Sequence, residues 1–291
     1  MDRTTFLCAT AGLFAAATLP VAAQTPSEKR SLWIWQTPLS QSAGIVAFAA
    51  ANDFGTLFLS VAKEDRSALE AGDASAAAAL RSLRATGRTL YLTAGDPAWV
   101  EKSRSEVPTT IRKLLERNRD KSLFDGLALD IEPHTLPDWK DGSNKDTLAH
   151  NYIALLALIR SKAAAQGVPV LATVHPTYAK YNPPGAYAAS LLQRAAGAVD
   201  STDLMAYRNA EATLESFGGE AMQQLGALGK PWWLGVSTHT NSPAGTSYAS
   251  LPAKSFFPSI DQTAADLAKR YGTSFAGIAV EDYRNTRTLL G

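Results

Sequence analysis

The sequence has a single cysteine, Cys8, close to its start. Because Cys8 has no partner, a disulfide framework within the chain is excluded. An excess of one charge is also missing, since 28 lysines and arginines stand against 27 aspartates and glutamates, a formal net charge of +1. No basic surplus is left to neutralise phosphates, so we expect no nucleic acid among the partners. With 46% hydrophobic and 19% charged residues, disorder and coiled coil are excluded too.

The first 23 residues have the pattern of a secretory signal peptide. Arg3 precedes an apolar stretch at 6–19, and small residues at 21–23 form a cleavage site before Gln24. The stretch is shorter than the roughly 20 residues of a membrane span, so no stable membrane insertion is expected after cleavage. The alternative, a buried helix, would need a polar face, which this run lacks. We predict a signal peptide over 1–23 and a secreted or periplasmic domain over 24–291.

The rest of the chain alternates between β-rich runs and segments of helical periodicity. The runs are at 32–36, 56–61, 89–94, 127–131, 170–175, 203–207, 232–237 and 277–281. Gly167 and Gly229 follow helical segments, where glycine supplies the left-handed turn that ends a helix. Ser259 and Asp261 are the predicted caps of the helix that runs through 267–271.

Eight strands alternating with helices over 24–291 predict an α/β fold, a single (β/α)8 TIM barrel. No repeat, low-complexity linker or charge run marks a second domain. An open doubly wound sheet is the alternative. It normally carries a glycine-rich phosphate turn after its first strand, whereas residues 35–38 read Trp-Gln-Thr-Pro. In a barrel the active site lies at the C-terminal ends of the strands.

Two acids share one face of the predicted fourth strand, where residues 124–134 read Phe-Asp-Gly-Leu-Ala-Leu-Asp-Ile-Glu-Pro-His. Side chains alternate along a strand, so the aliphatic residues at 127, 129 and 131 face the helices, and Asp130 and Glu132 point inward at the mouth. Burying acids is unfavourable unless they are paired or used. A salt bridge to an inward arginine or lysine is the structural alternative. Otherwise the two acids repel each other, and one keeps the proton that a general acid needs.

The other strand ends add polar and aromatic side chains to the predicted mouth. The candidate binding residues are Asp96, Trp99, His134, His175, Tyr178, Arg208, Asp282 and Trp35, and Tyr207 and Glu281 join the catalytic candidates. Carboxylates, aromatic faces and hydroxyl-binding groups together are typical of a sugar site. For Trp35, packing in the core is the alternative. A metal site of His134, His175 and His239 lacks any metal-ligand spacing, so we expect no metal and no cofactor.

The run at 125–132 resembles the fourth-strand signature of family 18 glycoside hydrolases, the chitinases and their relatives, Asp-x-x-Asp-x-Asp-x-Glu. Residues 205–207, Met-Ala-Tyr, are similar to the family's Met-x-Tyr-Asp element on strand six. The resemblance implies that Glu132 protonates the glycosidic oxygen, Asp130 orients an N-acetyl group and tunes Glu132, and Tyr207 hydrogen-bonds the same acetamido group. This sequence departs from the pattern at Ala128 and Arg208, where the family has aspartate, and we expect Arg208 to lower the pKa of a neighbouring carboxylate.

A second mechanism uses Glu281 as nucleophile or base opposite Glu132. The structural alternative is that Glu281 pairs with Arg208 or Arg284. The predicted function is a secreted glycoside hydrolase that acts on a polysaccharide or oligosaccharide by acid/base hydrolysis, with Glu132 as general acid. The alternative is a carbohydrate-binding relative that has lost turnover. A metal-dependent deacetylase is a third, more distant reading.

Overall fold

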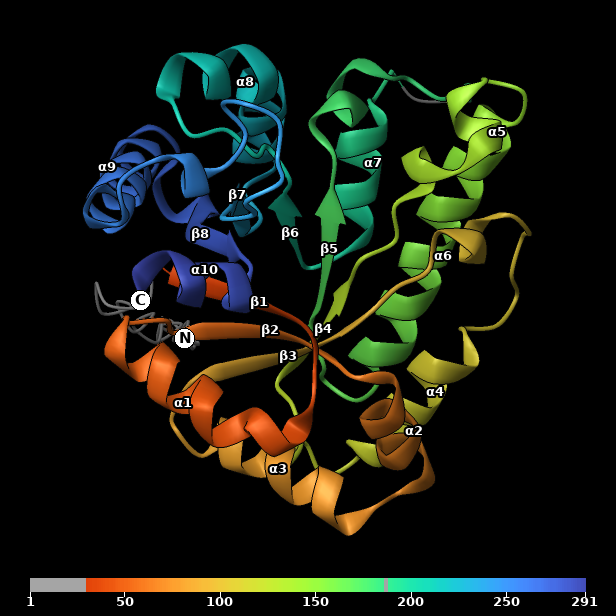
Figure 1. Ribbon diagram of the computed structural model, residues 1–291. Helices are drawn as coiled ribbons and strands as arrows, with labels where there is room; N and C mark the ends of the chain where they lie inside the picture. The colour runs from red at the N-terminus through yellow and green to blue at the C-terminus, as the bar shows by residue number, and fades with distance from the viewer. Residues whose placement is uncertain (1–29, 186–187) are drawn as a thin grey trace, which may run out of the picture.

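The computed structural model describes residues 30–185 and 188–291, in which eight parallel strands close into a barrel (Figure 1). The strands follow one another in chain order: β1 (Arg30–Thr37), β2 (Thr56–Val61), β3 (Thr89–Ala94), β4 (Gly126–Leu129), β5 (Val170–Val174), β6 (Ser201–Leu204), β7 (Trp232–Ser237) and β8 (Phe275–Glu281). β1 pairs with both β2 and β8, which closes the ring. The prediction of a single (β/α)8 barrel is confirmed. The predicted signal peptide lies outside the described residues.

Helices surround the strands (Figure 1). They are α1 (Ser42–Ala51), α2 (Lys63–Ala71), α3 (Ala74–Arg84), α4 (Thr109–Arg117), α5 (Pro137–Lys140), α6 (Lys145–Ala164), α7 (Leu191–Ala198), α8 (Glu211–Leu228), α9 (Ala253–Tyr271) and α10 (Tyr283–Leu290). Gly229 ends α8 in the left-handed conformation, with φ of 66°, as its position in the sequence predicted. Across 30–185 and 188–291, no helix combines the length and apolarity that a membrane crossing requires.

The start of α9 differs from its prediction. The helix begins at Ala253, so Ser259 and Asp261 lie inside it and do not cap it. Pro258 lies in its second turn, a position at which proline normally breaks a helix, and the helix continues through it. Asp261 instead forms an ion pair with Arg30 (2.5 Å from Oδ2 to Nη2), which ties α9 to the first residue of β1.

Two apolar cores follow from the alternation of side chains along each strand. The aliphatic residues of β4, Leu127 and Leu129, pack outward in the large core between strands and helices. Inside the barrel a smaller cluster is formed by Trp33, Phe58, Tyr91, Ala128, Leu171 and Ala279. The predicted inward faces of β4 and β8 are confirmed. The floor of the barrel is therefore apolar and aromatic, and the polar groups on the same faces lie toward the mouth.

One buried acid lies within this aromatic interior. Asp203, on β6, is 1% exposed and accepts a hydrogen bond from the indole nitrogen of Trp33 at 2.7 Å. Burial raises the pKa of Asp203 well above its usual range, and the nearby charges of Glu281 and Asp130 raise it further. Burial and the neighbouring acids thus favour the protonated form of Asp203, and the Trp33 indole is its hydrogen-bond partner.

Candidate active site

The backbone of β4 is held firmly where its acidic residues begin. The Asp130 amide donates to the carbonyl oxygen of Ala94 on β3 (3.1 Å), and the Thr173 hydroxyl on β5 donates to Asp130 Oδ1 (2.8 Å). β3 and β4 approach so closely at this point that a Cβ on Gly95 would lie 1.8 Å from the Asp130 carbonyl oxygen. Asp130 is thus fixed from both neighbouring strands, and Glu132 follows it two residues nearer the mouth.

The electrostatics of Glu132 suit a proton donor. Burial raises its pKa to about 7, and the charges of Asp130 and Glu281 contribute in the same direction. The pKa of Asp130 is raised to about 6, again chiefly by burial, although its hydrogen bond from Thr173 opposes the shift. The expectation that Arg208 lowers the pKa of a neighbouring carboxylate is not met at either acid. Its charge instead adds to burial in lowering the pKa of His175.

Glu281 ends β8 with two nitrogen-bearing neighbours. The indole nitrogen of Trp35 donates to Glu281 Oε1 at 3.1 Å, and His239 Nε2 lies 3.6 Å from the same oxygen. The Glu281 contact is the main reason that the pKa of His239 is raised. The predicted pairing of Glu281 with Arg208 or Arg284 is therefore not formed.

The two arginines have other partners. Arg284 donates to the Gln36 carbonyl oxygen at 3.0 Å. The guanidinium carbon of Arg208 lies 3.8 Å from the ring centre of Phe217 on α8, a cation–π contact, and its Nη1 donates to the Tyr207 carbonyl oxygen at 2.6 Å. Arg208 is thus turned toward α8, and neither arginine pairs with the Glu281 carboxylate.

A cavity of about 340 Å³ opens above the ends of β4 to β7. It is lined by Glu132, His134, His175, Met205, Tyr207, Arg208, Phe217, Ser237, Ser242, Pro243 and Thr246. Five predicted site residues meet here: Glu132, His134, His175, Tyr207 and Arg208. Burial raises the pKa of the Tyr207 hydroxyl well above its usual range, so this group stays a neutral hydrogen-bond donor.

The two histidines of the cavity act as a neutral pair. Their ring centres are 4.6 Å apart, and burial lowers the pKa of His134 to about 4 and also lowers that of His175. Each is held by a hydroxyl, His134 by Tyr178 (2.9 Å) and His175 by Thr177 (2.7 Å). They present uncharged imidazoles to a ligand at neutral pH.

Other predicted binding residues lie outside this cavity. Asp96 is exposed and accepts a hydrogen bond from the Ala98 amide (2.9 Å), which caps the short 3-10 turn Pro97–Val100. Trp99 packs against the outer core, and Tyr178 is 1% exposed behind His134. Asp282 is buried and caps α10. In this structure these four side chains support loops and helices.

Trp35 lies between the two roles weighed for it. Its ring stacks on Trp33 with 5.1 Å between centres and an interplanar angle of 7°, while its indole nitrogen reaches Glu281. Trp35 is partly buried. It thus contacts both the aromatic interior of the barrel, through Trp33, and the Glu281 carboxylate at the mouth.

Some important residues were not predicted from the sequence. The sequence suggests His239 only as a metal ligand, and it marks neither Phe217 nor Asp203 as a site residue. The signal for Asp203 was present, because alternation along the predicted run at 203–207 puts it on the same face as Met205 and Tyr207. The positions of Phe217 on a helix and His239 on a loop follow only from the tertiary structure. Among the residues that the structure describes, no group of three or more metal-ligating side chains is placed to hold an ion.

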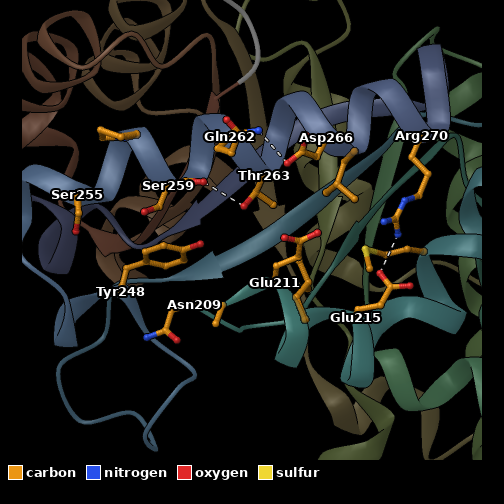
Figure 2. Close-up of a pocket in the computed structure, with 15 residues that line it drawn as sticks. Asn209, Glu211, Glu215, Tyr248, Ser255, Ser259, Gln262, Thr263, Asp266 and Arg270 are labelled. Carbon is orange, nitrogen blue, oxygen red and sulfur yellow. Dashed lines mark hydrogen bonds and ion pairs between the residues drawn. The ribbon is translucent and has the colours of Figure 1, made fainter.

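A second hollow, of about 450 Å³, lies outside the barrel between α8 and α9 (Figure 2). One end is closed by the Arg270–Glu215 ion pair, at 2.8 Å, and Tyr248 forms part of the wall at the other end (Figure 2). None of its lining residues belongs to a strand. Its lining includes none of the acids that follow β4 or end β8.

Comparison with solved structures finds glycoside hydrolase family 18 chitinases. A chitinase from Chromobacterium violaceum ATCC 12472 is similar with a TM-score of 0.55 and 13% identity over 90% of this chain and 98% of that chain. The Group IV chitinase of Ostrinia furnacalis, solved with allosamidin, gives 0.52 and 15% over 91% and 95%. A family 18 chitinase mutant from Cycas revoluta in complex with (GlcNAc)4 gives 0.51 and 13% over 90% and 97%.

At 13–15% identity these comparisons show the fold: a (β/α)8 barrel similar to those of the chitinases. The sequence resemblance concerned short motifs, whereas the similarity in fold covers about 90% of the chain. No family model matches the sequence. No curated protein matches it either.

Proposed function

We propose that the protein is a glycoside hydrolase that cleaves an oligosaccharide or polysaccharide, with Glu132 as the general acid. The observation that carries this proposal is the placement of Glu132 on the wall of the mouth cavity, where burial and two further acids raise its pKa to about 7. A carboxyl group that still holds its proton near neutral pH is what protonation of a glycosidic oxygen requires.

In the proposed reaction the Glu132 proton passes to the glycosidic oxygen as the bond from that oxygen to the anomeric carbon breaks. Positive charge then develops on the sugar ring, and water adds to the anomeric carbon and gives a proton to a carboxylate of the mouth, which balances the proton that Glu132 donated. Asp130, fixed by Thr173, maintains the high pKa of Glu132. Glu281 supplies the second carboxylate of the mouth, oriented by Trp35 and His239.

The first substrate to test is a chitin oligosaccharide, because the Cycas revoluta neighbour was solved with (GlcNAc)4. In the mechanism that the family resemblance implies, Asp130 and Tyr207 would hold the substrate's acetamido group, which would assist the departure of the leaving group. In the alternative two-carboxylate mechanism, Glu281 would act as the nucleophile or base. The assay measures new reducing ends from N-acetylated tetrasaccharides. Tight binding without any new reducing ends would identify the non-catalytic carbohydrate-binding relative instead.

We also propose that the protein is exported, on the basis of the signal-peptide pattern at 1–23. Expression of the full chain in a bacterial host is expected to yield a periplasmic or secreted protein that begins at Gln24. N-terminal sequencing or intact mass measurement checks this. Recovery of an uncleaved chain from the cytoplasm would contradict it.

The pH dependence of hydrolysis should have an alkaline limb near pH 7. Glu132 acts only while protonated, so the rate falls as the pH rises through the pKa of about 7, and by about tenfold per pH unit well above it. The Asp130→Asn variant should move this limb to lower pH, because it removes a negative charge that raises the pKa of Glu132. The measurement is kcat/KM between pH 4 and pH 9.

The matched control is Asp125→Asn. Asp125 begins the same motif, but it accepts hydrogen bonds from Arg84 (2.7 Å) and the Leu90 amide (2.9 Å) at the far end of the strand. Asp125→Asn should leave the pH of the alkaline limb unchanged, even where it lowers stability. If Asp130→Asn also left the pH of this limb unchanged, the proposed effect of Asp130 on the pKa of Glu132 would be contradicted.

A further inference from the structure

Arg208 is a cation on the cavity wall without an acidic partner. Its Nη1 donates to the Tyr207 carbonyl oxygen, and the guanidinium lies on the Phe217 ring. Across 30–185 and 188–291 it takes part in no ion pair, although it lines the same cavity as Glu132. Stacking and one carbonyl bond fix the direction of the side chain and leave other guanidinium N–H groups for a ligand.

The lining of the cavity carries one permanent cation, Arg208. Apart from the two histidines and Tyr207, the only other ionisable lining residue is Glu132. The two histidines are neutral, since their pKa values are lowered, and Tyr207 is neutral as well. Glu132 must hold its proton in the active form. Arg208 is therefore the cation of the lining, beside neutral groups able to donate hydrogen bonds, whereas the acids Asp130 and Glu281 lie outside the lining.

We propose that this cavity binds a sugar unit that carries a carboxylate, and that Arg208 is the residue that selects it. A planar guanidinium matches a carboxylate geometrically, and a pair formed in a half-buried, aromatic-walled pocket is less screened by water than one on the surface. The inference rests on the proposed function, because it takes the mouth cavity as the carbohydrate site. It narrows the substrate class to acidic glycans.

The test compares acidic tetrasaccharides with their own neutral forms. Tetrasaccharides of hyaluronan and of polygalacturonate are titrated calorimetrically against the full protein, each beside a sample in which the uronate carboxyls have been reduced to alcohols. We expect at least one acidic form to bind about 10- to 100-fold more tightly than its reduced counterpart, with affinity falling as salt is added. Equal affinity for acidic and reduced forms, or no binding of either acidic form, would overturn the proposal.

Variants then assign the preference to Arg208. Arg208→Gln should remove the preference for the acidic form while leaving affinity for the reduced form within about twofold, and Arg208→Lys should restore part of it. Arg112→Gln is the matched control, because it removes the same charge from the exposed surface of α4. A preference that survives Arg208→Gln would overturn the role of Arg208, and the wild-type comparison does not depend on how any variant folds.

Hydrolysis measured in parallel separates this inference from the proposed function. Preferential, Arg208-dependent binding of an acidic glycan with no new reducing ends would keep the inference and reject the hydrolase. Cleavage of (GlcNAc)4 that needs Glu132, with no preference for acidic glycans, would keep the hydrolase and reject the inference. Binding of neither class would reject both.

Discussion

Replacing Glu132 by glutamine is expected to lower kcat by about 10²- to 10⁴-fold, with binding of the oligosaccharide retained. Glutamine has nearly the same shape as glutamic acid but cannot release a proton to the glycosidic oxygen. The residue lines the cavity and is otherwise kept neutral by burial, so a neutral amide is well tolerated there. Reducing-end assays give kcat, and calorimetric titration of the same preparation gives the affinity.

Glu64→Gln is the control for Glu132→Gln, because it removes a carboxylate from the exposed side of α2 and should leave activity unchanged.

The stability of Glu132→Gln toward urea offers a second measurement. The folded-state pKa of Glu132 is raised above its usual value of 4.5, so ionisation destabilises the fold as the pH rises from about 4.5 through 7. Glu132→Gln should therefore be more resistant to urea than wild type at pH 8, and equally resistant at pH 4. Wild-type turnover in Glu132→Gln would exclude it as the acid.

Replacing Gly95 by alanine is expected to damage both stability and activity. The new Cβ would lie 1.8 Å from the Asp130 carbonyl oxygen and 2.3 Å from its carbonyl carbon, and both neighbours are main-chain atoms that cannot rotate away. β3 and β4 would have to separate at the point that positions Glu132. Overpacking of this kind lowers the free energy of unfolding by about 1–3 kcal/mol or more. A displacement of about 1 Å at a catalytic group lowers kcat by about 10²-fold.

The matched control is Gly197→Ala. Gly197 lies on the exposed side of α7, with no atom within 4 Å of the position that a Cβ would take. Alanine favours a helix over glycine by up to about 1 kcal/mol, so this variant should be as stable as wild type or slightly more so. Urea unfolding and kcat are measured for both variants. If Gly95→Ala matched Gly197→Ala in both, the close approach of β3 and β4 would not exist in solution.

The strands and their facing side chains could be predicted because both follow local rules. The runs at 56–61, 89–94 and 232–237 agree with β2, β3 and β7 to the residue. On β4, alternation alone placed Asp130 and Glu132 on the inward side. The start of α9 could not be predicted in this way, because Pro258 normally interrupts a helix and is tolerated here.

The partners of the charged residues could not be predicted, since their side chains reach across elements far apart in the chain. Glu281 meets His239 and Trp35, whereas the structural alternative weighed from the sequence was an arginine partner. Arg208 lies against Phe217, nine residues further along the chain on α8. Tyr178 follows a strand, as a ligand-binding residue often does, but the chain folds it behind His134, where it is 1% exposed.

The sequence by itself determined the closed ring of strands, the inward direction of Asp130 and Glu132, and the acidic character of the mouth, because hydrophobic periodicity and the pleat of a strand are properties of neighbouring residues. Only the tertiary structure decided which acid holds its proton, which histidine faces which carboxylate, and that Arg208 is left with no acid to pair with. Those outcomes depend on burial and on distances between side chains brought together from separate strands and loops, and no local pattern encodes them.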